Sequence, residues 1–385
     1  MARLGDICTI VSGTTPKSSC PEYWDGNINW VTPAELNDES DVIYESQRKI
    51  TKQAVTDSNL KSFPAGTVLL SSRAPIGKVA IAGTEMYCNQ GFKNLICSDA
   101  IYNRYLYHFL KNKTEFLNSL GRGATFKEIS KSIVEDIEIP LPLLEEQRRI
   151  AALLDKVSDL IVKRRAQLDK LDLLVKARFV EMFGNIIYER NRWEICDVGS
   201  VADIIDPQPS HRTPPISEDG IPYIGVTECN YETLSIDFEK ARKVGQDVLK
   251  EHLARYTVDE GDFIIGKIGT IGKPFVVPVE RNYTLSANTV LIKPLKGKVN
   301  SQFLFSVFQS EYMDRIIDEE KKSTSQPAFG IQKIRKIEIP LPPLKLQEDF
   351  AFFVGQRNKS KLTIQQNLSK LKILKKAYMQ QCFGE

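Results

Sequence analysis

The sequence repeats itself at a distance of 200 residues, and this repeat limits the fold more than any other feature. Residues 137–184 align without a gap with residues 337–384 and share 17 identities in 48 positions. Both copies begin with Ile-Glu-Ile-Pro-Leu-Pro and end with Phe-Gly. We therefore expect two copies of one structural unit in the chain.

The segments that precede each repeat are related more loosely. Residues 63–70, which lead to Ile76-Gly77-Lys78, parallel residues 258–265, which lead to Ile271-Gly272-Lys273. The offset here is 195, so insertions and deletions separate the two copies. The repeated unit thus contains a conserved part and a divergent part.

The divergent parts have the pattern of mixed α and β structure. Short apolar runs bounded by Gly, Pro and Ser predict strands at 67–70, 79–82, 263–265 and 275–279, and helical patterns occupy 102–117 and 301–317. We expect two globules of the α+β class, each with an antiparallel or mixed sheet.

The conserved parts predict two long helices. Pro140 and Pro142 remove backbone donors, so a helix can begin only after them, and Gly184 and Gly384 stand where C-terminal caps belong. Each helix would have about 39 residues and a length on the order of 58 Å. Apolar residues recur at three- and four-residue steps, at Ile150, Leu154, Val157, Ile161, Leu168, Leu171, Val175 and Met182 and again at Phe350, Val354, Ile364, Leu368, Leu371, Tyr378 and Cys382.

A helix with so narrow an apolar stripe needs a partner, and the other copy is the natural one. We predict antiparallel pairing, which would make the N- and C-termini neighbours. The fold class is therefore α+β: two α/β domains joined by two long antiparallel coiled-coil helices, with an internal pseudo-twofold duplication. We place the domains at 1–143, 144–184, 185–343 and 344–385, in the order globule, helix, globule, helix.

Composition and motifs favour a protein without a catalytic site. The net charge is only +3, and the helices carry the positive excess. We expect a cytoplasmic protein, because no apolar run is long enough to span a membrane and the start lacks a signal-peptide pattern. The 7 cysteines show no C-x-x-C pair and are expected to be reduced. None of the 3 histidines adjoins a nucleophile motif, and the glycine-rich run at 266–274 has neither the spacing nor the hydroxyl of a phosphate loop.

The order of the motifs resembles a known family. These motifs are Leu4-Gly5-Asp6-Ile7, Gly13-Thr14-Thr15-Pro16, Gly66-Thr67-Val68-Leu69-Leu70, Pro75-Ile76-Gly77, and then I-x-I-P-L-P followed by Gln147 and a long helix. Each motif alone is weak evidence for a family, but their order and their duplication are specific. The whole chain is similar to the specificity subunit of Type I restriction-modification systems.

This resemblance implies a non-catalytic DNA-binding subunit. Each globule would be a target recognition domain that reads one half of a split double-stranded DNA sequence, and the helices would be a spacer of fixed length. Two methyltransferase subunits would dock on the helices and restriction subunits would join them. The chain itself would bind no cofactor, because S-adenosylmethionine, ATP and Mg would be bound by the partner subunits.

Candidate site residues follow from side-chain chemistry and loop position. Base readers need hydrogen-bonding groups on loops, with Arg or Lys suited to guanine and Asn or Gln to adenine. The candidates are Thr14, Thr15, Lys17, Arg73, Lys78, Asn89, Gln90 and Lys93 in the first globule and Gln208, Ser210, His211, Arg212, Lys267, Lys273 and Asn288 in the second. For partner docking or helix structure the candidates are Gln147, Arg164, Arg178, Gln347, Arg357, Lys361 and Lys375.

Two other functions remain open at this point. A DNA-binding or regulatory protein that acts alone would bind its site without a methyltransferase. A coiled-coil scaffold without a nucleic-acid role would select no motif from random duplexes.

Overall fold

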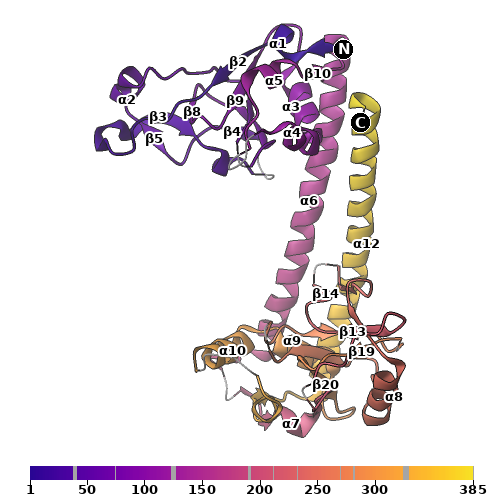
Figure 1. The fold of residues 1–385 in the computed structure, drawn as a ribbon. Coiled ribbons are helices and arrows are strands. Elements are labelled where there is room, and N and C mark those ends of the chain that lie inside the picture. Colours follow the sequence, from indigo (N-terminus) through magenta and orange to yellow (C-terminus); the bar gives the residue numbers. More distant parts are fainter. Residues whose placement is uncertain are drawn as a thin grey trace. The chain divides into compact units, whose positions relative to one another are not determined.

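The computed structural model describes residues 1–37, 41–73, 75–122, 127–189, 192–210, 212–231, 233–268, 270–280, 282–323 and 329–384. The chain divides into two compact units (Figure 1). The first comprises Met1–Gln167 with Ile364–Glu385, and the second comprises Leu168–Thr363. Each unit therefore contains one globule and a portion of both long helices. Among the described residues, no helix has both the length and the apolar character needed to cross a membrane.

The first globule is built around a mixed sheet, as predicted. The strand order is β2-β9-β6-β7-β4, formed by Cys8–Ser12, Lys93–Cys97, Val68–Leu70, Val79–Ala82 and Val42–Ile43. The pairs are antiparallel except β4 with β7. A smaller sheet has the order β5-β3-β8, from Lys49–Ile50, Trp24–Val31 and Tyr87–Cys88, and here β3 and β8 run parallel.

Helix α3 (Asn103–Asn112) covers β6 and β7 and buries Tyr105, Leu106, Phe109 and Leu110. The helix predicted at 102–117 is in fact two helices, because the chain leaves helical geometry at Lys113 before α4 (Thr114–Leu120) begins. The remaining elements are β1 (Ala2–Arg3), α1 (Leu4–Ile7), η1 (Pro21–Tyr23), η2 (Pro33–Glu35), α2 (Lys52–Asp57), α5 (Lys131–Glu135) and β10 (Glu138–Ile139). Strand β1 pairs with β10 next to the start of the first long helix.

The second globule repeats this topology. Its main sheet has the order β12-β20-β17-β18, formed by Ala202–Ile205, Thr289–Pro294, Phe263–Gly266 and Phe275–Val276. A second sheet has the order β16-β13-β19, from Arg242–Val244, Ile221–Ile224 and Thr284–Leu285, and again β13 and β19 run parallel. The duplication detected in the sequence thus extends to the order and direction of the strands, except that the described residues of the second globule show no counterpart of β4 in the main sheet.

The helices of the second globule also follow the first. The helix predicted at 301–317 is again two, α9 (Ser301–Phe308) and α10 (Glu311–Ser323), with the interruption at Gln309. The Asn300 side chain caps α9 by accepting hydrogen bonds from the Gln302 and Phe303 amides. The other elements are β11 (Ile195–Asp197), α7 (Val198–Val201), β14 (Cys229–Asn230), β15 (Ser235–Ile236), α8 (Gln246–Arg255), α11 (Ile331–Arg335) and β21 (Glu338–Pro340).

The two long helices are α6 (Leu144–Phe183) and α12 (Leu344–Phe383), at the repeat distance of the sequence. In the first unit the beginning of α6 shares a core with the end of α12. In the second unit the end of α6 shares a core with the beginning of α12. Antiparallel pairing is therefore confirmed, and both chain termini lie in the first unit (Figure 1). Gly184 and Gly384 end the helices with positive φ angles of 82° and 71°.

The predicted apolar stripe is correct for the first turns of both helices, where Ile150, Leu154, Phe350 and Val354 are buried. The last turns differ from the prediction. Phe179, Phe183, Met379 and Phe383 are more deeply buried there than the stripe residues Met182 and Cys382. The cause is a second contact, because the helix ends also pack against the globules, as Phe183 does on Phe303 with ring centroids 4.8 Å apart.

Candidate nucleic-acid interface

Three loops of the first globule meet beside the main sheet, and they carry most of the predicted DNA-contacting residues of that half. The Thr14 amide donates to the Cys88 carbonyl over 3.0 Å, and the Ser72 amide donates to the Gly91 carbonyl over 2.8 Å. The Thr15 hydroxyl donates to the Gln90 side-chain oxygen. The loops after β2, β6 and β8 are therefore held together, and Thr14, Thr15, Asn89 and Gln90 lie in one place.

A carboxylate that the sequence did not single out organises the basic residues of these loops. Glu128 lies 3.2 Å from Nζ of Lys93 and 3.6 Å from Nε of Arg73. Lys93 is buried, and its ammonium also donates to the Ser72 hydroxyl over 3.4 Å. Lys78 donates to the Pro33 carbonyl over 3.3 Å, and Lys17 is exposed. Lys93 therefore fixes the loops, while Arg73 keeps an accessible guanidinium.

In the second globule a buried histidine orders the loop after β12. His252 is fully buried; its Nε2 lies 2.6 Å from the Gln208 side-chain oxygen and its Nδ1 lies 2.6 Å from the Thr284 hydroxyl. Gln208 in turn donates to the Ser210 hydroxyl over 2.9 Å. Arg212 follows with an exposed side chain. His211 lies outside the described residues.

Lys267 occupies the loop after β17 and is buried against Asp206, with Nζ 2.9 Å from the carboxylate. Its amide donates to the Asn288 carbonyl over 2.8 Å. Gln208, Ser210, Lys267 and Asn288 thus share one loop cluster. Lys273 does not join it, because its ammonium lies over the Tyr231 ring, 5.3 Å from the centroid.

The two loop clusters use the same backbone frame. The Ile129 amide donates to the Ser72 carbonyl over 2.9 Å, and the Phe329 amide donates to the Lys267 carbonyl over 2.8 Å. A glycine with positive φ follows at the same place in each, at Gly77 (89°) and Gly272 (87°). A side chain at Gly272 would also collide with Ile317, only 1.9 Å from the added carbon. Extending the repeat alignment upstream of residue 137 would have shown the sequence equivalence of Ile129 and Phe329.

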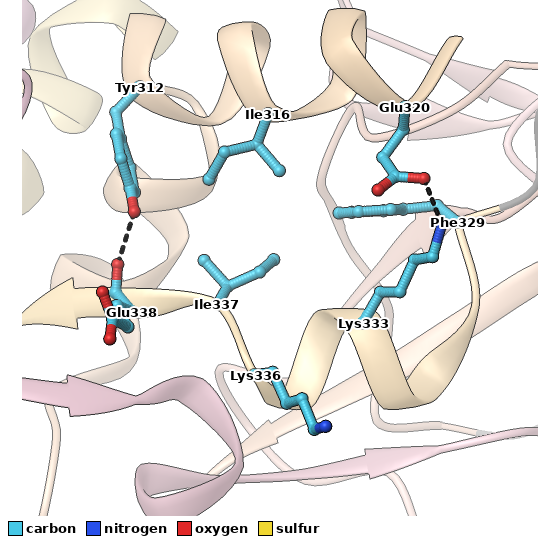
Figure 2. Close-up of a pocket in the computed structure, with 8 residues that line it drawn as sticks. All are labelled: Tyr312, Ile316, Glu320, Phe329, Lys333, Lys336, Ile337 and Glu338. Carbon is cyan, nitrogen blue, oxygen red and sulfur yellow. Dashed lines mark hydrogen bonds and ion pairs between the residues drawn. The ribbon is translucent and has the colours of Figure 1, made fainter. Parts of the chain in front are cut away.

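Two cavities adjoin this frame in the second globule. One of about 490 Å³ is lined by Asp206, Lys267, Ile268, Phe329, Gly330, Ile331, Gln332 and Lys333. The other, of about 270 Å³, lies between α10 and the segment from α11 to β21 (Figure 2). In it Lys333 pairs with Glu320 and the Tyr312 hydroxyl donates to the Glu338 carbonyl over 2.7 Å. In the described part of the chain, no group of three or more His, Cys, Asp or Glu side chains could hold a metal ion.

Gln147 and Gln347 are fully buried and anchor the starts of the long helices. Gln147 accepts from the Tyr102 amide over 2.8 Å and donates to the Ala100 and Pro142 carbonyls. Gln347 likewise accepts from the Asn300 amide over 2.8 Å. Their polar atoms are therefore used within the chain, at the starts of the two long helices.

The basic docking candidates on the long helices divide into two groups. Arg357 and Lys361 both contact Asp172 of α6, and Arg357 also donates to the Leu171 carbonyl over 3.2 Å. Burial lowers the pKa of Arg357, and burial together with repulsion from Arg357 lowers that of Lys361. Lys375 donates to the Ser158 hydroxyl over 2.7 Å. These three residues connect the two helices.

Arg164 and Arg178 instead form their polar contacts within α6. Arg164 donates to Gln167 over 2.7 Å, and Arg178 lies 2.9 Å from Glu181. The guanidinium of Arg178 also lies over the Phe353 ring. All three contacts lie within this chain, so a role for Arg164 and Arg178 in docking a partner subunit stays a prediction.

Exposed apolar residues recur at equivalent positions of the two long helices. The three pairs are Val162 with Leu362, Leu173 with Ile373, and Leu174 with Leu374, and their exposures range from 48% to 69%. Leu173 and Leu174 of α6 belong to the second unit, and Ile373 and Leu374 of α12 stand at the equivalent positions in the first unit. Each unit thus presents an equivalent uncovered apolar face on one of the long helices.

Comparison with known proteins places the chain in a family. The Type I restriction modification DNA specificity domain matches residues 1–171 and 191–373. The chain is 30% identical over 404 residues to the Type I restriction enzyme MjaIX specificity subunit of Methanocaldococcus jannaschii, covering 100% of this chain and 92% of that protein. It is 24% identical over 377 residues to the MjaVIII specificity subunit of the same organism, covering 91% and 84%.

Solved structures have the same fold. The crystal structure of the Type I restriction-modification S subunit from M. genitalium superimposes with a TM-score of 0.60 at 15% identity, over 100% of this chain and 95% of that one. A chain from a structural study of the assembly of a Type I R-M system also gives 0.60, at 19% identity and coverages of 99% and 96%. With both halves matched by the specificity domain, the chain belongs to the specificity (S) subunits of Type I restriction-modification systems.

Proposed function

We propose that this specificity subunit reads a bipartite double-stranded DNA target with a gap of fixed length. Residues 1–143 read one half-site and residues 185–343 read the other. The helical segments 144–184 and 344–385 keep the two readers apart, so the bases between the half-sites are not read. The chain performs no catalysis in this role.

One observation carries this proposal. The two globules hold their loops on the same backbone frame, through the amides of Ile129 and Phe329, yet the side chains on those loops differ. A common frame with different hydrogen-bonding groups suits two readers that approach DNA alike and prefer different bases. A target made of two unlike half-sites is the expected result.

The side chains divide by exposure. Thr14, Thr15, Lys17 and Gln90 in the first globule, and Ser210, Arg212 and Asn288 in the second, are exposed and accessible to DNA, while Arg73, Lys78 and Asn89 are partly exposed. Lys93, Gln208 and Lys267 are buried, and we assign to them the positioning of the loops. Lys273 lies outside the loop cluster and is better placed for phosphate than for bases.

The exposed apolar faces of α6 and α12 suggest the partners. Two equivalent faces suit two copies of one protein, and we propose that two methyltransferase subunits bind there, with restriction subunits joining the complex. S-adenosylmethionine, ATP and Mg are then bound by those subunits. The complex acts in the cytoplasm, where it has access to the DNA. A net charge of +3 gives the chain alone little general attraction for phosphate, so full affinity depends on the partners.

Methylome sequencing of cells that carry this chain with its cognate methyltransferase tests the proposal. We expect one methylated motif with two short defined parts and a constant gap. A contiguous motif would contradict the two-reader arrangement. Tight, sequence-specific binding by the purified chain alone would favour a protein that acts without a methyltransferase. A selection from random duplexes that returns no motif, even with the methyltransferase present, would favour a scaffold.

A further inference from the structure

Two cysteines of the first globule face each other across an antiparallel strand pair. Cys8 of β2 is opposite Cys97 of β9. The neighbouring pair, Ile7 and Ser98, is a hydrogen-bonded pair, because the Ser98 amide donates to the Ile7 carbonyl over 3.0 Å. Hydrogen-bonded and non-hydrogen-bonded pairs alternate along an antiparallel ladder, so Cys8 and Cys97 form a non-hydrogen-bonded pair.

This position brings the two thiols within bonding reach. The Cα atoms of a non-hydrogen-bonded pair are about 4.5 Å apart, and their side chains lie on the same face of the sheet. A disulfide spans Cα separations of roughly 4.4–6.8 Å. The backbone of β2 and β9 therefore needs little movement to accept a disulfide.

The two thiols also differ in reactivity. The Cys8 thiol hydrogen-bonds to the Cys97 sulfur, and this bond lowers the pKa of Cys97 although burial opposes the effect. The same hydrogen bond, together with burial, raises the pKa of Cys8. Cys97 is only partly buried whereas Cys8 is buried, so Cys97 is the more accessible thiol and the one that peroxide reaches first.

We propose that Cys8 and Cys97 are an oxidation site that forms an intramolecular disulfide when the protein meets hydrogen peroxide. The Cys97 thiolate attacks a peroxide oxygen, the O–O bond breaks, and a sulfenic acid and one water form. The Cys8 thiol then attacks the Cys97 sulfur, forming the S–S bond and releasing the hydroxyl group as a second water. The two thiols lose two electrons and two protons, and the peroxide is reduced to two waters.

The position of the disulfide predicts its effect. Both cysteines lie at the ends of β2 and β9 that are remote from the reading loops, which begin after Ser12 and end before Lys93. The bond would close residues 9–96 into a loop and restrict the unfolded chain. We therefore expect the oxidised globule to resist unfolding while its DNA preference is unchanged. The second globule offers an internal comparison, because Ala202 and Pro294 occupy the corresponding positions.

Peptide mapping tests the proposal on the full chain. The protein is treated with hydrogen peroxide, free thiols are blocked with N-ethylmaleimide, and trypsin releases Cys8 in residues 4–17 and Cys97 in residues 94–104. We expect these two peptides to be cross-linked after oxidation and separate after reduction with dithiothreitol. If both peptides carry N-ethylmaleimide after peroxide treatment that oxidises other thiols, the proposal is wrong.

Variants establish the order of the reaction. In Cys8→Ser the sulfenic acid on Cys97 cannot be resolved, and dimedone should label residue 97. Cys97→Ser should leave Cys8 unlabelled. Cys196→Ser is the matched control, because Cys196 faces Ile339 and not another thiol, and the cross-link should persist there. Dimedone on Cys8 but not on Cys97 would overturn the assigned roles. Should a variant not fold, the wild-type map still decides whether the bond forms.

Discussion

Nε2 of His108 lies 2.7 Å from the carboxylate of Asp155, which joins α3 of the first globule to the long helix α6. Arg104 donates to the same carboxylate over 2.6 and 3.0 Å. Burial raises the pKa of Asp155, but the hydrogen bonds from His108 and Arg104 outweigh it, so the pKa falls below its usual 3.8. The other ring nitrogen of His108, Nδ1, is buried without a hydrogen-bond partner.

This pair makes the first globule sensitive to acid. Burial lowers the pKa of His108 below 6.5, and the positive charges of Lys375 and Arg104 act in the same direction against the attraction of Asp155. Because the unfolded chain takes up the proton first, stability is complete above pH 6.5 and falls as the pH drops below it. We expect the melting temperature to fall between pH 7 and 5. In His108→Gln the melting temperature should fall less steeply with pH. If the melting temperature of the variant depends on pH as strongly as that of the wild type, His108 is not the cause of the acid sensitivity.

Gln147→Ala and Gln347→Ala should destabilise their own units by similar amounts. Each removes a buried side chain that satisfies backbone groups at the start of a long helix, at a cost of about 2 kcal/mol. Hydrogen exchange should show increased opening around Tyr102 in the first variant and around Asn300 in the second. Gln167→Ala, at an exposed position of α6, is the control and should change the free energy of unfolding by less than about 0.5 kcal/mol.

Leu173→Asp and Ile373→Asp should each remove one methyltransferase subunit from the complex. A carboxylate in the centre of an apolar contact is left desolvated, which should weaken binding by about 2 kcal/mol or more. Native mass spectrometry should show one copy bound in each single variant and none in the double variant. Lys170→Asp, at an exposed position one turn away, tests whether charge alone has this effect. Two copies retained in the double variant would place the docking surface elsewhere.

Arg73→Ala and Arg212→Ala should relax different halves of the DNA target. Loss of a guanidinium that reads a base costs about 1–3 kcal/mol and lowers preference at that base. Methylome sequencing should therefore show degeneracy in one half-site for Arg73→Ala and in the other for Arg212→Ala. Degeneracy in the same half-site for both variants would contradict the assignment of one reader to each globule.

Seven residues inserted into both α6 and α12 should lengthen the unread gap. Seven helical residues add about 10 Å, which corresponds to roughly three base pairs of DNA. The half-sites themselves should stay the same. Methylation of sites with the original gap, and not with the longer one, would refute the helices as the spacer.

The sequence predicted the elements whose cause is local and left out those that depend on tertiary pairing. The long helices and the caps at Gly184 and Gly384 follow from prolines, glycines and apolar spacing, and all were found. The interruptions at Lys113 and Gln309 were missed, because neither residue is a proline or glycine. The parts of the candidate site that were missed are its acidic partners.

Glu128 and Asp206 illustrate the difficulty. Glu128 meets Lys93 across 35 positions of sequence, and Asp206 meets Lys267 across 61. Nothing near either carboxylate in the sequence distinguishes it from a solvated one. Loop position alone identified the lysines as candidates, and only the fold showed that Lys93 and Lys267 are buried.

The frame shared by both loop clusters affects how such a protein can evolve. Ser72 and Lys267 accept the clamping hydrogen bonds through their carbonyl oxygens, which every amino acid possesses. The exposed side chains on the loops beside these two positions can therefore change while the clamp persists. Mutations that alter the preferred bases can accumulate with little loss of folding free energy, so new specificities are open to natural selection without a passage through unstable intermediates.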